Sequence, residues 1–482
     1  MKTSFASFAF NSIKWSGFSQ FGRQFFQIIT SIILARLLLP EDFGLIGMAF
    51  IVIGFLNIFK DLGTSAAIIQ KENISERLLS SVFWLNVIIG LTISIIVFSL
   101  SNFINLLFND NRVGPILSVM SVSFLITSVG NVHQAILEKK LLFKKLAKIE
   151  IIAIFISSLL GILFALKGFK VWSLVIQNLS ALAITSVLLW FGEKWYPRTF
   201  INLNELKSLF RYSGFLTGFN IFNYLFRNVD NFLIGKYIGA KNLGYYNLAY
   251  RIMLYPMQSI TIVITRVMFP LYSRINTDHE RLRAMYIKVA QAITLITFPL
   301  MIWLMVVSKE LILNVFGKNW QPAEILILIL APVGMIQSID GTVGSIYQST
   351  GRTDIMFKWG LYSGIFSIIV FIIGLHWGVI GVAFAYLIFT VLLLIPGLYL
   401  PFRLIDLKVS FFLKNLVRIF LISLSMGAIV YLAGFFLVAH GLYELILKSI
   451  LAVVLYVLFN FVFNKKIIIE IFEIIQKSPS ES

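Results

Sequence analysis

The 482-residue sequence contains no cysteine, and only 13% of its residues are charged. The missing thiols exclude disulfides, thiolate zinc sites and thiol catalysis. Only four histidines occur, and they are scattered along the chain without an HExxH pair, so a metal site is not expected. Soluble domains carry about 25% charged residues. The shortage of charge therefore excludes an ordinary soluble enzyme and a disordered protein.

Motifs of the common enzymes are missing as well. The sequence has no GxxxxGK[ST] loop for ATP hydrolysis, no GxSxG nucleophile motif, and no Asp-x-Asp pair in a loop of the kind that metal-dependent glycosyltransferases use. No predicted loop is long enough to hold a folded extramembrane domain. We therefore expect a protein that is not an enzyme and that has no resident cofactor.

Hydrophobic residues make up 59% of the chain, and the mean hydropathy is +0.90. A membrane-spanning helix needs about 20 mainly apolar residues. The sequence predicts an all-α polytopic membrane protein with about fourteen transmembrane helices, at 15–38, 44–66, 79–100, 113–136, 148–166, 171–192, 208–235, 244–265, 284–307, 324–347, 355–375, 379–400, 415–436 and 442–463.

The basic residues set the expected orientation. Lys and Arg number 40 against 22 acidic residues, and 26 of the 40 fall on one side of the predicted helices and 7 on the other. Cytoplasmic loops carry such an excess, so both termini are expected in the cytoplasm. The same rule explains much of the net charge of +18 without a nucleic-acid partner. The seven outer residues are Arg112, Lys167, Lys170, Lys236, Lys241, Lys309 and Lys318.

A weak repeat relates the first two predicted helices to the seventh and eighth. Phe43-Gly44 aligns with Leu243-Gly244 at an offset of 200 residues, and several polar positions align likewise. Six spans return a chain to its starting side, so the two copies would be parallel. This predicts a six-helix bundle over residues 1–200, a second over 201–400 with a central cavity between them, and two extra helices with a cytoplasmic tail over 401–482.

Polar residues inside the predicted spans mark the candidate site. A charge within the bilayer is costly unless it faces protein or water. Helical spacing places such residues on one face of helices one, seven and eight. The predicted polar lining of the cavity comprises Gln20, Gln27, Asn220, Asn223, Asn247, Tyr250 and Tyr255, and the cationic candidates are Arg23, Arg251 and Arg227.

Each charged position has a structural alternative. Arg227 and Asp230, three residues apart, could simply neutralise each other, and Lys60 is expected to extend its amine towards the cytoplasmic interface. Arg23 and Arg251 have no acidic neighbour on their own helices. One arginine side chain can donate two parallel hydrogen bonds to two oxygens of a phosphate. Arg23 and Arg251 are therefore the preferred ligands for an anionic cargo.

Several stretches resemble one family. The run from Arg227 through Gly235-Lys236 to Leu243-Gly244 and Tyr250-Arg251 is similar to the signature of the bacterial polysaccharide transporter family, the O-antigen and exopolysaccharide flippases of the MOP flippase superfamily. Weaker similarity lies at Leu34–Gly44, Asp61–Gly63, Val267–Ser273 and Gln348–Asp354. The resemblance covers about residues 10–400 and is strongest to the colanic-acid and teichuronic-acid exporter branch.

The resemblance implies a flippase for undecaprenyl-diphosphate-linked oligosaccharide in the bacterial inner membrane, working by alternating access between two helix bundles. It implies membrane lipids and a polysaccharide polymerase or export machinery as partners. Lipid II flippases, which are relatives, carry cations in helices one and eight of the cavity, where Arg23 and Arg251 fall. Their cationic cluster in helix one is denser than the single Arg23 here, which disfavours lipid II as the cargo.

Coupling to Na⁺ or H⁺ is a further expectation, with Asp230, Asp340 and Asp61 as candidate residues. Two alternatives stay open. A cation-coupled drug antiporter of the same superfamily would have an acidic cavity, whereas basic residues prevail here. A non-transporting membrane scaffold for glycan assembly would tolerate loss of the cavity arginines.

Overall fold

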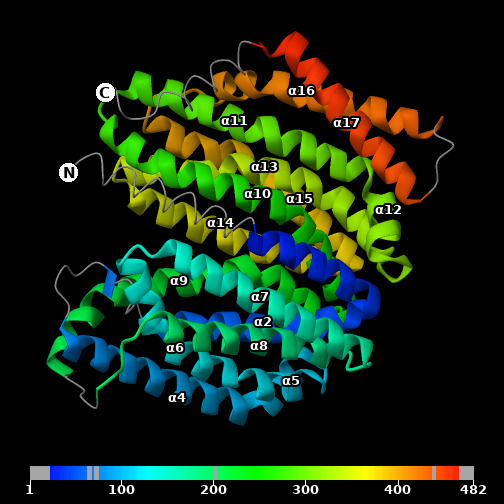
Figure 1. Cartoon of the computed structure of the whole chain (residues 1–482). Helices are drawn as coiled ribbons and strands as arrows, with labels where there is room; N and C mark the ends of the chain where they lie inside the picture. The colour runs from blue at the N-terminus through cyan, green and yellow to red at the C-terminus, as the bar shows by residue number, and fades with distance from the viewer. Residues whose placement is uncertain (1–21, 62–67, 70–74, 199–202, 437–440, 466–482) are drawn as a thin grey trace. The chain divides into compact units, whose positions relative to one another are not determined.

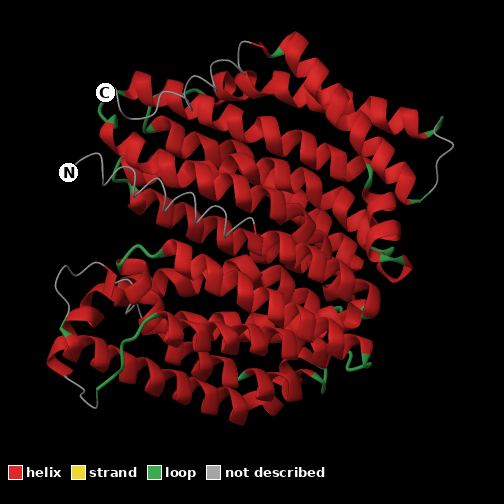
Figure 2. Cartoon of the chain, in the orientation of Figure 1, coloured by secondary structure: helices red, strands yellow, loops and turns green. Residues whose placement is uncertain are grey.

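A computed structural model of the chain describes residues 22–61, 68–69, 75–198, 203–436 and 441–465, and within these ranges all regular secondary structure is helical (Figures 1 and 2). Contacts divide the chain into two compact units, Met1–Asn247 (unit 1) and Leu248–Ser482 (unit 2). The boundary falls inside one long helix, α10. The division into two units reports packing and does not test the sequence repeat with an offset of 200 residues. The repeat stays a prediction.

In the described part of unit 1, a first helix over residues 22–37 is followed by seven helices of eight or more residues before α10 begins. They are α2 (Pro40–Asp61), α4 (Glu76–Phe108), α5 (Val113–Met120), α6 (Val122–Lys139), α7 (Phe143–Leu166), α8 (Val171–Gly192) and α9 (Leu203–Tyr237), followed by α10 (Ala240–Arg274).

Unit 2 holds the rest of α10 and the helices that follow it. They are α11 (His279–Val306), α12 (Ser308–Leu311), the π-helical turn η1 (Ile312–Phe316), the 3₁₀ turn η2 (Lys318–Trp320), α13 (Ala323–Ser349), α14 (Thr353–Gly374), the 3₁₀ turn η3 (Leu375–Trp377), α15 (Gly378–Arg403), α16 (Val409–Gly434) and α17 (Leu442–Phe463).

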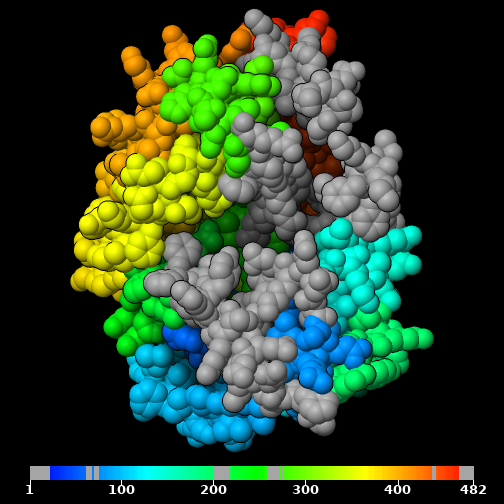
Figure 3. Space-filling view, turned by 90° about the vertical axis from the view of Figure 1, so that its left-hand side faces the viewer, coloured from blue at the N-terminus to red at the C-terminus, as the bar shows by residue number. Residues whose placement is uncertain are grey.

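The predicted all-α polytopic membrane fold is confirmed. Among the described residues, ten stretches are long and apolar enough to cross a membrane, and one of them, Thr353–Arg403, includes both α14 and α15. The outward faces of these helices are apolar, as lipid requires: α4 exposes Ile95 and Phe98, and α14 exposes Ile369 and Ile373. Figure 3 shows α14 (yellow) and α16 (orange) at the surface of unit 2.

Helix starts follow local capping rules. The Ser75 hydroxyl accepts a hydrogen bond from the Leu78 amide (3.0 Å) at the start of α4, and the Asp278 carboxylate accepts one from the Arg281 amide (3.0 Å) at the start of α11. In α2, Pro40 occupies the first position, where its missing N–H is not needed. Polar side chains thus replace the backbone partners that a helix terminus lacks.

Small residues bring the helices of unit 1 close together. A Cβ on Gly90 would lie 2.1 Å from the Ser128 hydroxyl oxygen, so α4 and α6 meet there at backbone distance. The Ser186 hydroxyl donates to the Ile126 carbonyl (2.8 Å) and joins α8 to α6. Membrane helices commonly associate through such small residues and short polar contacts, because lipid provides little hydrophobic driving force.

Two glycines at the start of α2 and α10 make reciprocal contacts within unit 1. A Cβ on Gly44 would lie 1.6 Å from the carbonyl oxygen of Ala240, and a Cβ on Gly244 would lie 1.9 Å from the carbonyl oxygen of Pro40. Gly244 lies 200 residues after Gly44, and Ala240 lies 200 residues after Pro40. Any side chain at either position would push the two helix starts apart.

Several polar side chains between the helices of unit 2 form hydrogen bonds with one another. Thr297 and Ser338 hydroxyls lie 3.0 Å apart, those of Tyr286 and Thr342 lie 2.8 Å apart, and the Gln337 amide donates to the Tyr386 hydroxyl at 2.5 Å. These bonds join α11, α13 and α15.

An ion cluster fastens α17 to the end of α12. The Lys448 ammonium lies 2.6 Å from a Glu310 carboxylate oxygen and 2.7 Å from a Glu444 oxygen, and its side chain is only 8% exposed. Gly434 on α16 leaves room for the lysine stem, because a Cβ there would lie 2.8 Å from it. Helix α17 is therefore anchored to α12 by buried charge.

Candidate functional site

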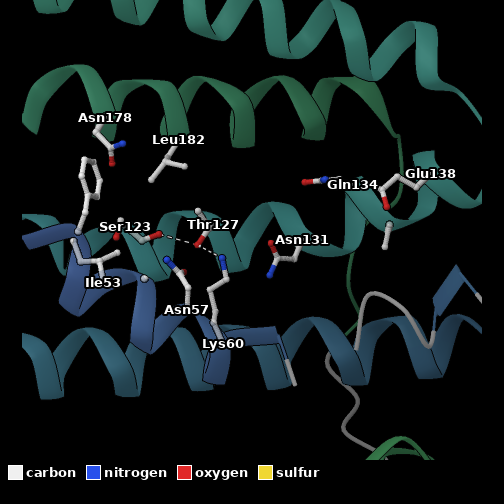
Figure 4. A pocket seen from close by; sticks show the side chains of 13 residues that line it. Ile53, Asn57, Lys60, Ser123, Thr127, Asn131, Gln134, Glu138, Asn178 and Leu182 are labelled. Carbon is white, nitrogen blue, oxygen red and sulfur yellow. Dashed lines mark hydrogen bonds between the residues drawn. The ribbon is translucent and has the colours of Figure 1, made fainter. Parts of the chain in front are cut away.

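A polar pocket of about 550 Å³ lies inside unit 1, between α2, α6 and α8 (Figure 4). Helix α2 contributes one wall, α6 a second, and α8 a third. The lining residues are Phe50, Ile53, Gly54, Asn57, Lys60, Ser123, Thr127, Asn131, Gln134, Ala135, Glu138, Asn178 and Leu182. The amides and hydroxyls of this cavity, inside a membrane-embedded bundle, can form hydrogen bonds with a polar ligand.

Helix α6 supplies most of the polar wall through a single stripe. Ser123, Thr127, Asn131, Gln134 and Glu138 follow one another at spacings of four, four, three and four residues. Residues three and four apart share a helix face, so all five side chains line the same side of the helix. The other faces of α6 pack in the bundle and bury Phe124, Val132 and Leu137 together with Ser128 and His133.

The Lys60 ammonium lies within the pocket. It donates a hydrogen bond to the Thr127 hydroxyl oxygen (3.0 Å), and that hydroxyl donates in turn to the Ser123 carbonyl (2.8 Å) (Figure 4). The expectation that Lys60 extends to the cytoplasmic interface is therefore wrong. Thr127 of α6 keeps the Lys60 ammonium inside the bundle, where the ammonium can face an anionic or hydroxylated ligand.

Three amide side chains in the pocket are available to a ligand. Asn57, Asn131 and Asn178 make no side-chain hydrogen bond to any other residue that the structure describes. Each amide has two donor hydrogens and an acceptor oxygen, which suits the hydroxyl groups of a sugar. At the end of the row, Glu138 accepts a hydrogen bond from Gln134 (2.8 Å).

Helix α9 fixes the position of the α2 wall. The Tyr224 hydroxyl donates to the Ile51 carbonyl (2.9 Å) and lies 3.3 Å from the Phe50 carbonyl. This approach is possible because residue 54 is glycine: a Cβ there would lie 2.2 Å from the tyrosine oxygen. Gly54 thus serves both the wall of the pocket and the contact between α2 and α9.

The predicted arginines lie outside this pocket. Arg23 has no acidic neighbour on its own helix, but it pairs with Glu150 of α7 (3.2 Å). Arg227 and Arg251 are exposed, the first in unit 1 and the second in unit 2. Their binding of a diphosphate stays a prediction.

The predicted polar lining is only partly described. Gln27, Asn220 and Asn223 are exposed in unit 1, and Asn247 packs against Gly47 of α2. In unit 2, Tyr255 is half-buried and the ring of Tyr250 lies 6.3 Å from that of Tyr386. Gln20 falls outside the described residues.

Two of the three candidate coupling carboxylates are described. Asp230 is buried and accepts hydrogen bonds from the Tyr246 hydroxyl (2.8 Å) and the Asn231 amide (2.7 Å). It forms no ion pair with a described residue, so mutual neutralisation with Arg227 is wrong. Asp340 is exposed, 3.6 Å from where a Cβ on Gly397 would lie, and the side chain of Asp61 is outside the description.

Sequence reasoning missed the α6 wall. The signal is a polar stripe of helical period in the fourth predicted span, but its residues before Glu138 are uncharged, and uncharged polar residues also occur in ordinary helix packing.

Comparison with known proteins identifies the family. A family model described as "Polysaccharide biosynthesis protein" matches residues 33–325. The chain belongs to this family. The resemblance drawn from the sequence motifs is confirmed.

Two relatives are similar to this chain along most of their own length. The teichuronic acid biosynthesis protein TuaB of Bacillus subtilis is 30% identical over 426 residues, 87% of each chain. The lipopolysaccharide biosynthesis protein WzxC of Escherichia coli is 30% identical over 368 residues, 75% of this chain and 74% of its own.

Solved structures show the same fold. The inward closed conformation of the lipid II flippase MurJ has a TM-score of 0.75 at 16% identity and covers 97% of this chain and 100% of its own. An inward-facing MATE family transporter of the MOP superfamily has a TM-score of 0.65 at 16% identity, with 80% and 94% covered. At this identity the likeness shows the fold of the multi-pass membrane protein and nothing of its cargo.

Proposed function

We propose that the protein is a flippase that moves undecaprenyl-diphosphate-linked oligosaccharide from the cytoplasmic to the outer leaflet by alternating access. The observation that carries the proposal is the pocket of unit 1, where Lys60 and three available amides line a cavity of about 550 Å³. The names of the relatives support a role in surface polysaccharide biosynthesis. Amides suit the sugar hydroxyls, and a lysine suits an acidic sugar or a phosphate.

The proposed location is the inner membrane of a bacterium, with both termini in the cytoplasm. The 26 to 7 division of basic residues supports this orientation. The orientation also provides a driving force. A diphosphate with a charge of about −2 gains roughly 4–5 kcal/mol per 100 mV when it moves outward from a negative interior.

Coupling to Na⁺ or H⁺ through Asp230, Asp340 or Asp61 is a secondary part of the proposal, and the membrane potential suffices without it. We further propose that the protein catalyses no covalent chemistry and works beside a polysaccharide polymerase or export machinery. Arg23, Arg227 and Arg251 remain the proposed ligands of the diphosphate.

Headgroup translocation in liposomes tests the proposal. The full chain is reconstituted with undecaprenyl-diphosphate oligosaccharide, and transport is scored by the accessibility of the sugar to an impermeant oxidant. Lys60→Gln should lower the translocation rate by roughly ten- to a hundredfold, because the cargo loses a hydrogen bond from the charged ammonium. Lys288→Gln on α11, outside the pocket, is the matched control and should transport normally.

Several results would overturn the proposal. Wild-type liposomes that translocate no faster than protein-free ones would exclude the flippase. Normal transport by Lys60→Gln together with slow transport by Arg23→Ala and Arg251→Ala would move the binding site from the pocket to the arginines. Normal transport by all three variants would leave the charged groups with structural roles only.

A further inference from the structure

A second cavity, of about 520 Å³, lies at the other end of α2 in unit 1. The turn between α7 and α8 forms one side, and the first turns of α2 and α8 form the others. Its lining residues are Asp42, Leu45, Arg112, Lys167, Gly168, Phe169, Lys170, Val171 and Trp172. On the proposed topology this end faces outward, away from the cytoplasmic ends of the helices.

The backbone of the α7–α8 turn is held in an uncommon conformation. Gly168 has φ 81° and Lys170 has φ 48°, a left-handed value that a lysine rarely adopts. The turn is fixed by hydrogen bonds from the Phe169 amide to the Phe164 carbonyl (3.1 Å) and from the Trp172 amide to the Phe169 carbonyl (3.0 Å). Strain of this kind persists only where the surrounding structure enforces it.

The carboxylate of Asp42 ties the turn to α2. It accepts hydrogen bonds from the Leu39 amide (3.0 Å) at the start of α2 and from the Val171 amide at the start of α8. Asp42 is 8% exposed and its oxygens are already engaged by the two helix starts. The carboxylate therefore shapes the cavity, and it attracts the Lys170 ammonium without forming an ion pair with it.

The charges around the cavity divide into two groups. Arg112 is held by Glu41 (2.7 Å) and Asp110 (2.8 Å). Lys167 and Lys170 are exposed, and neither has a carboxylate within ion-pair distance in the part of the chain that the structure describes. These two ammonium groups are the available cations of the cavity.

The position of these lysines is unusual for the chain. Only seven basic residues fall in the predicted outer loops, and Arg112, Lys167 and Lys170 are three of them. The positive-inside rule accounts for basic residues on the cytoplasmic side only, so it does not explain this group. A local function for the charge is the better explanation.

Two aromatic side chains accompany the lysines. Phe169 is 45% exposed at the tip of the turn, and Trp172 begins α8 beside it. Tryptophan at a helix end sits at the depth of the lipid headgroups. Ammonium groups at this depth meet the phosphate oxygens of lipids.

We propose that the α7–α8 turn binds a lipid-borne phosphate in the outer leaflet, with Lys167 and Lys170 pairing with the phosphate oxygens and Phe169 and Trp172 lying against the rest of the headgroup. The phosphate belongs either to a resident anionic phospholipid or to the diphosphate of a cargo that has just crossed. The second source rests on the proposed function; the first requires only the proposed orientation.

Lipid binding to the purified full chain tests the site. Short-chain phosphatidylglycerol and farnesyl diphosphate are titrated separately, with phosphatidylcholine as the zwitterionic comparison, and bound lipid is counted by native mass spectrometry. The double variant Lys167→Gln/Lys170→Gln should bind about tenfold more weakly, because each lysine near a lipid surface contributes to phosphate binding. Lys309→Gln/Lys318→Gln removes the same charge from outer loops of unit 2 and should bind within about twofold of wild type.

A third variant separates charge from folding. Lys170→Gly keeps the left-handed backbone and relieves its strain, so it should raise the melting temperature and still weaken phosphate binding. Lys167→Arg/Lys170→Arg keeps the charge and should bind as wild type does. A selective loss for phosphatidylglycerol identifies the resident lipid, and a selective loss for farnesyl diphosphate identifies the cargo.

Equal binding of both anionic probes by wild type and the Lys167→Gln/Lys170→Gln variant overturns the site, as does an equal loss in the unit 2 control. The outcome is independent of the transport assay. A failed flippase assay leaves binding of phosphatidylglycerol at the turn intact, and absent binding at the turn leaves translocation through the pocket intact.

Discussion

The polar side chains of the unit 1 pocket and those between the helices of unit 2 use their hydrogen-bonding groups in different ways. In unit 1, Asn57, Asn131 and Asn178 line a cavity without a hydrogen-bond partner among the described residues. In unit 2, Gln337 bonds to Tyr386, and Lys448 bonds to two glutamates. Polar groups that satisfy one another stabilise the fold, whereas polar groups left facing a cavity are available to a ligand. Substitutions in the two units should therefore affect different measurements.

The largest effect is expected at the ion cluster of unit 2. Lys448→Met removes the buried cation that Glu310 and Glu444 share, and breaking a buried pair in this way costs about 3–5 kcal/mol. The variant should show a markedly lower melting temperature in detergent. Lys465→Met is the control, because that lysine is exposed and only its ring contact with Phe461 is lost. Equal melting temperatures of Lys448→Met and wild type would mean that the cluster does not anchor α17.

The next effect concerns the pocket of unit 1. Asn131→Leu removes an amide that bonds to no described residue, so the melting temperature should stay the same or rise. Transport should nevertheless fall by roughly five- to fiftyfold, since about 1–2 kcal/mol of ligand hydrogen bonding is lost. The liposome assay and a thermal melt on the same preparation check both parts. A fall in stability with normal transport would reverse the comparison between the units.

Gln337→Leu is the corresponding change in unit 2. It removes the hydrogen bond that the Gln337 amide donates to the Tyr386 hydroxyl, at a cost of about 1 kcal/mol. The melting temperature should fall while the transport rate of the folded fraction stays within about twofold of wild type. Loss of transport at full stability would place a ligand contact in unit 2 as well.

The smallest effect is expected at the outer ion pair of unit 1. The Arg112 guanidinium, which bonds to it, lowers the pKa of Asp110 below its usual value of 3.8. A depressed carboxylate pKa adds stability that is present above the unfolded value and is lost as the pH falls through the folded value. Wild type should melt slightly above Asp110→Asn near pH 6, and the two should converge as the pH falls below about 4. A difference that persists in acid would show that the charge of Asp110 is not the cause.

The helices could be predicted well from sequence because a membrane span is a long, continuous signal. The fourteen predicted spans correspond to the helix at 22–37, α2, α4, the α5–α6 pair, α7 to α11, and α13 to α17. The pocket was harder, because its walls come from three helices and each contributes few polar residues.

Side-chain partners could not be predicted from one helix at a time. Arg23 lacks an acidic neighbour on its own helix, but Glu150 reaches it from α7. Lys60 lies near the end of α2, where an extended amine is the usual outcome, but Thr127 of α6 holds it in the pocket. Both outcomes depend on packing between helices, which a periodic pattern does not encode.

The reciprocal contacts of Gly44 and Gly244 have the form of an isologous interface. Gly44 approaches the carbonyl four residues before Gly244, and Gly244 approaches the carbonyl four residues before Gly44. Identical subunits meet in this way across a twofold axis. A half-length chain that paired with a second copy of itself would make this contact twice without any further change. Because the two contacts are equivalent, the two glycines should respond alike to substitution by alanine.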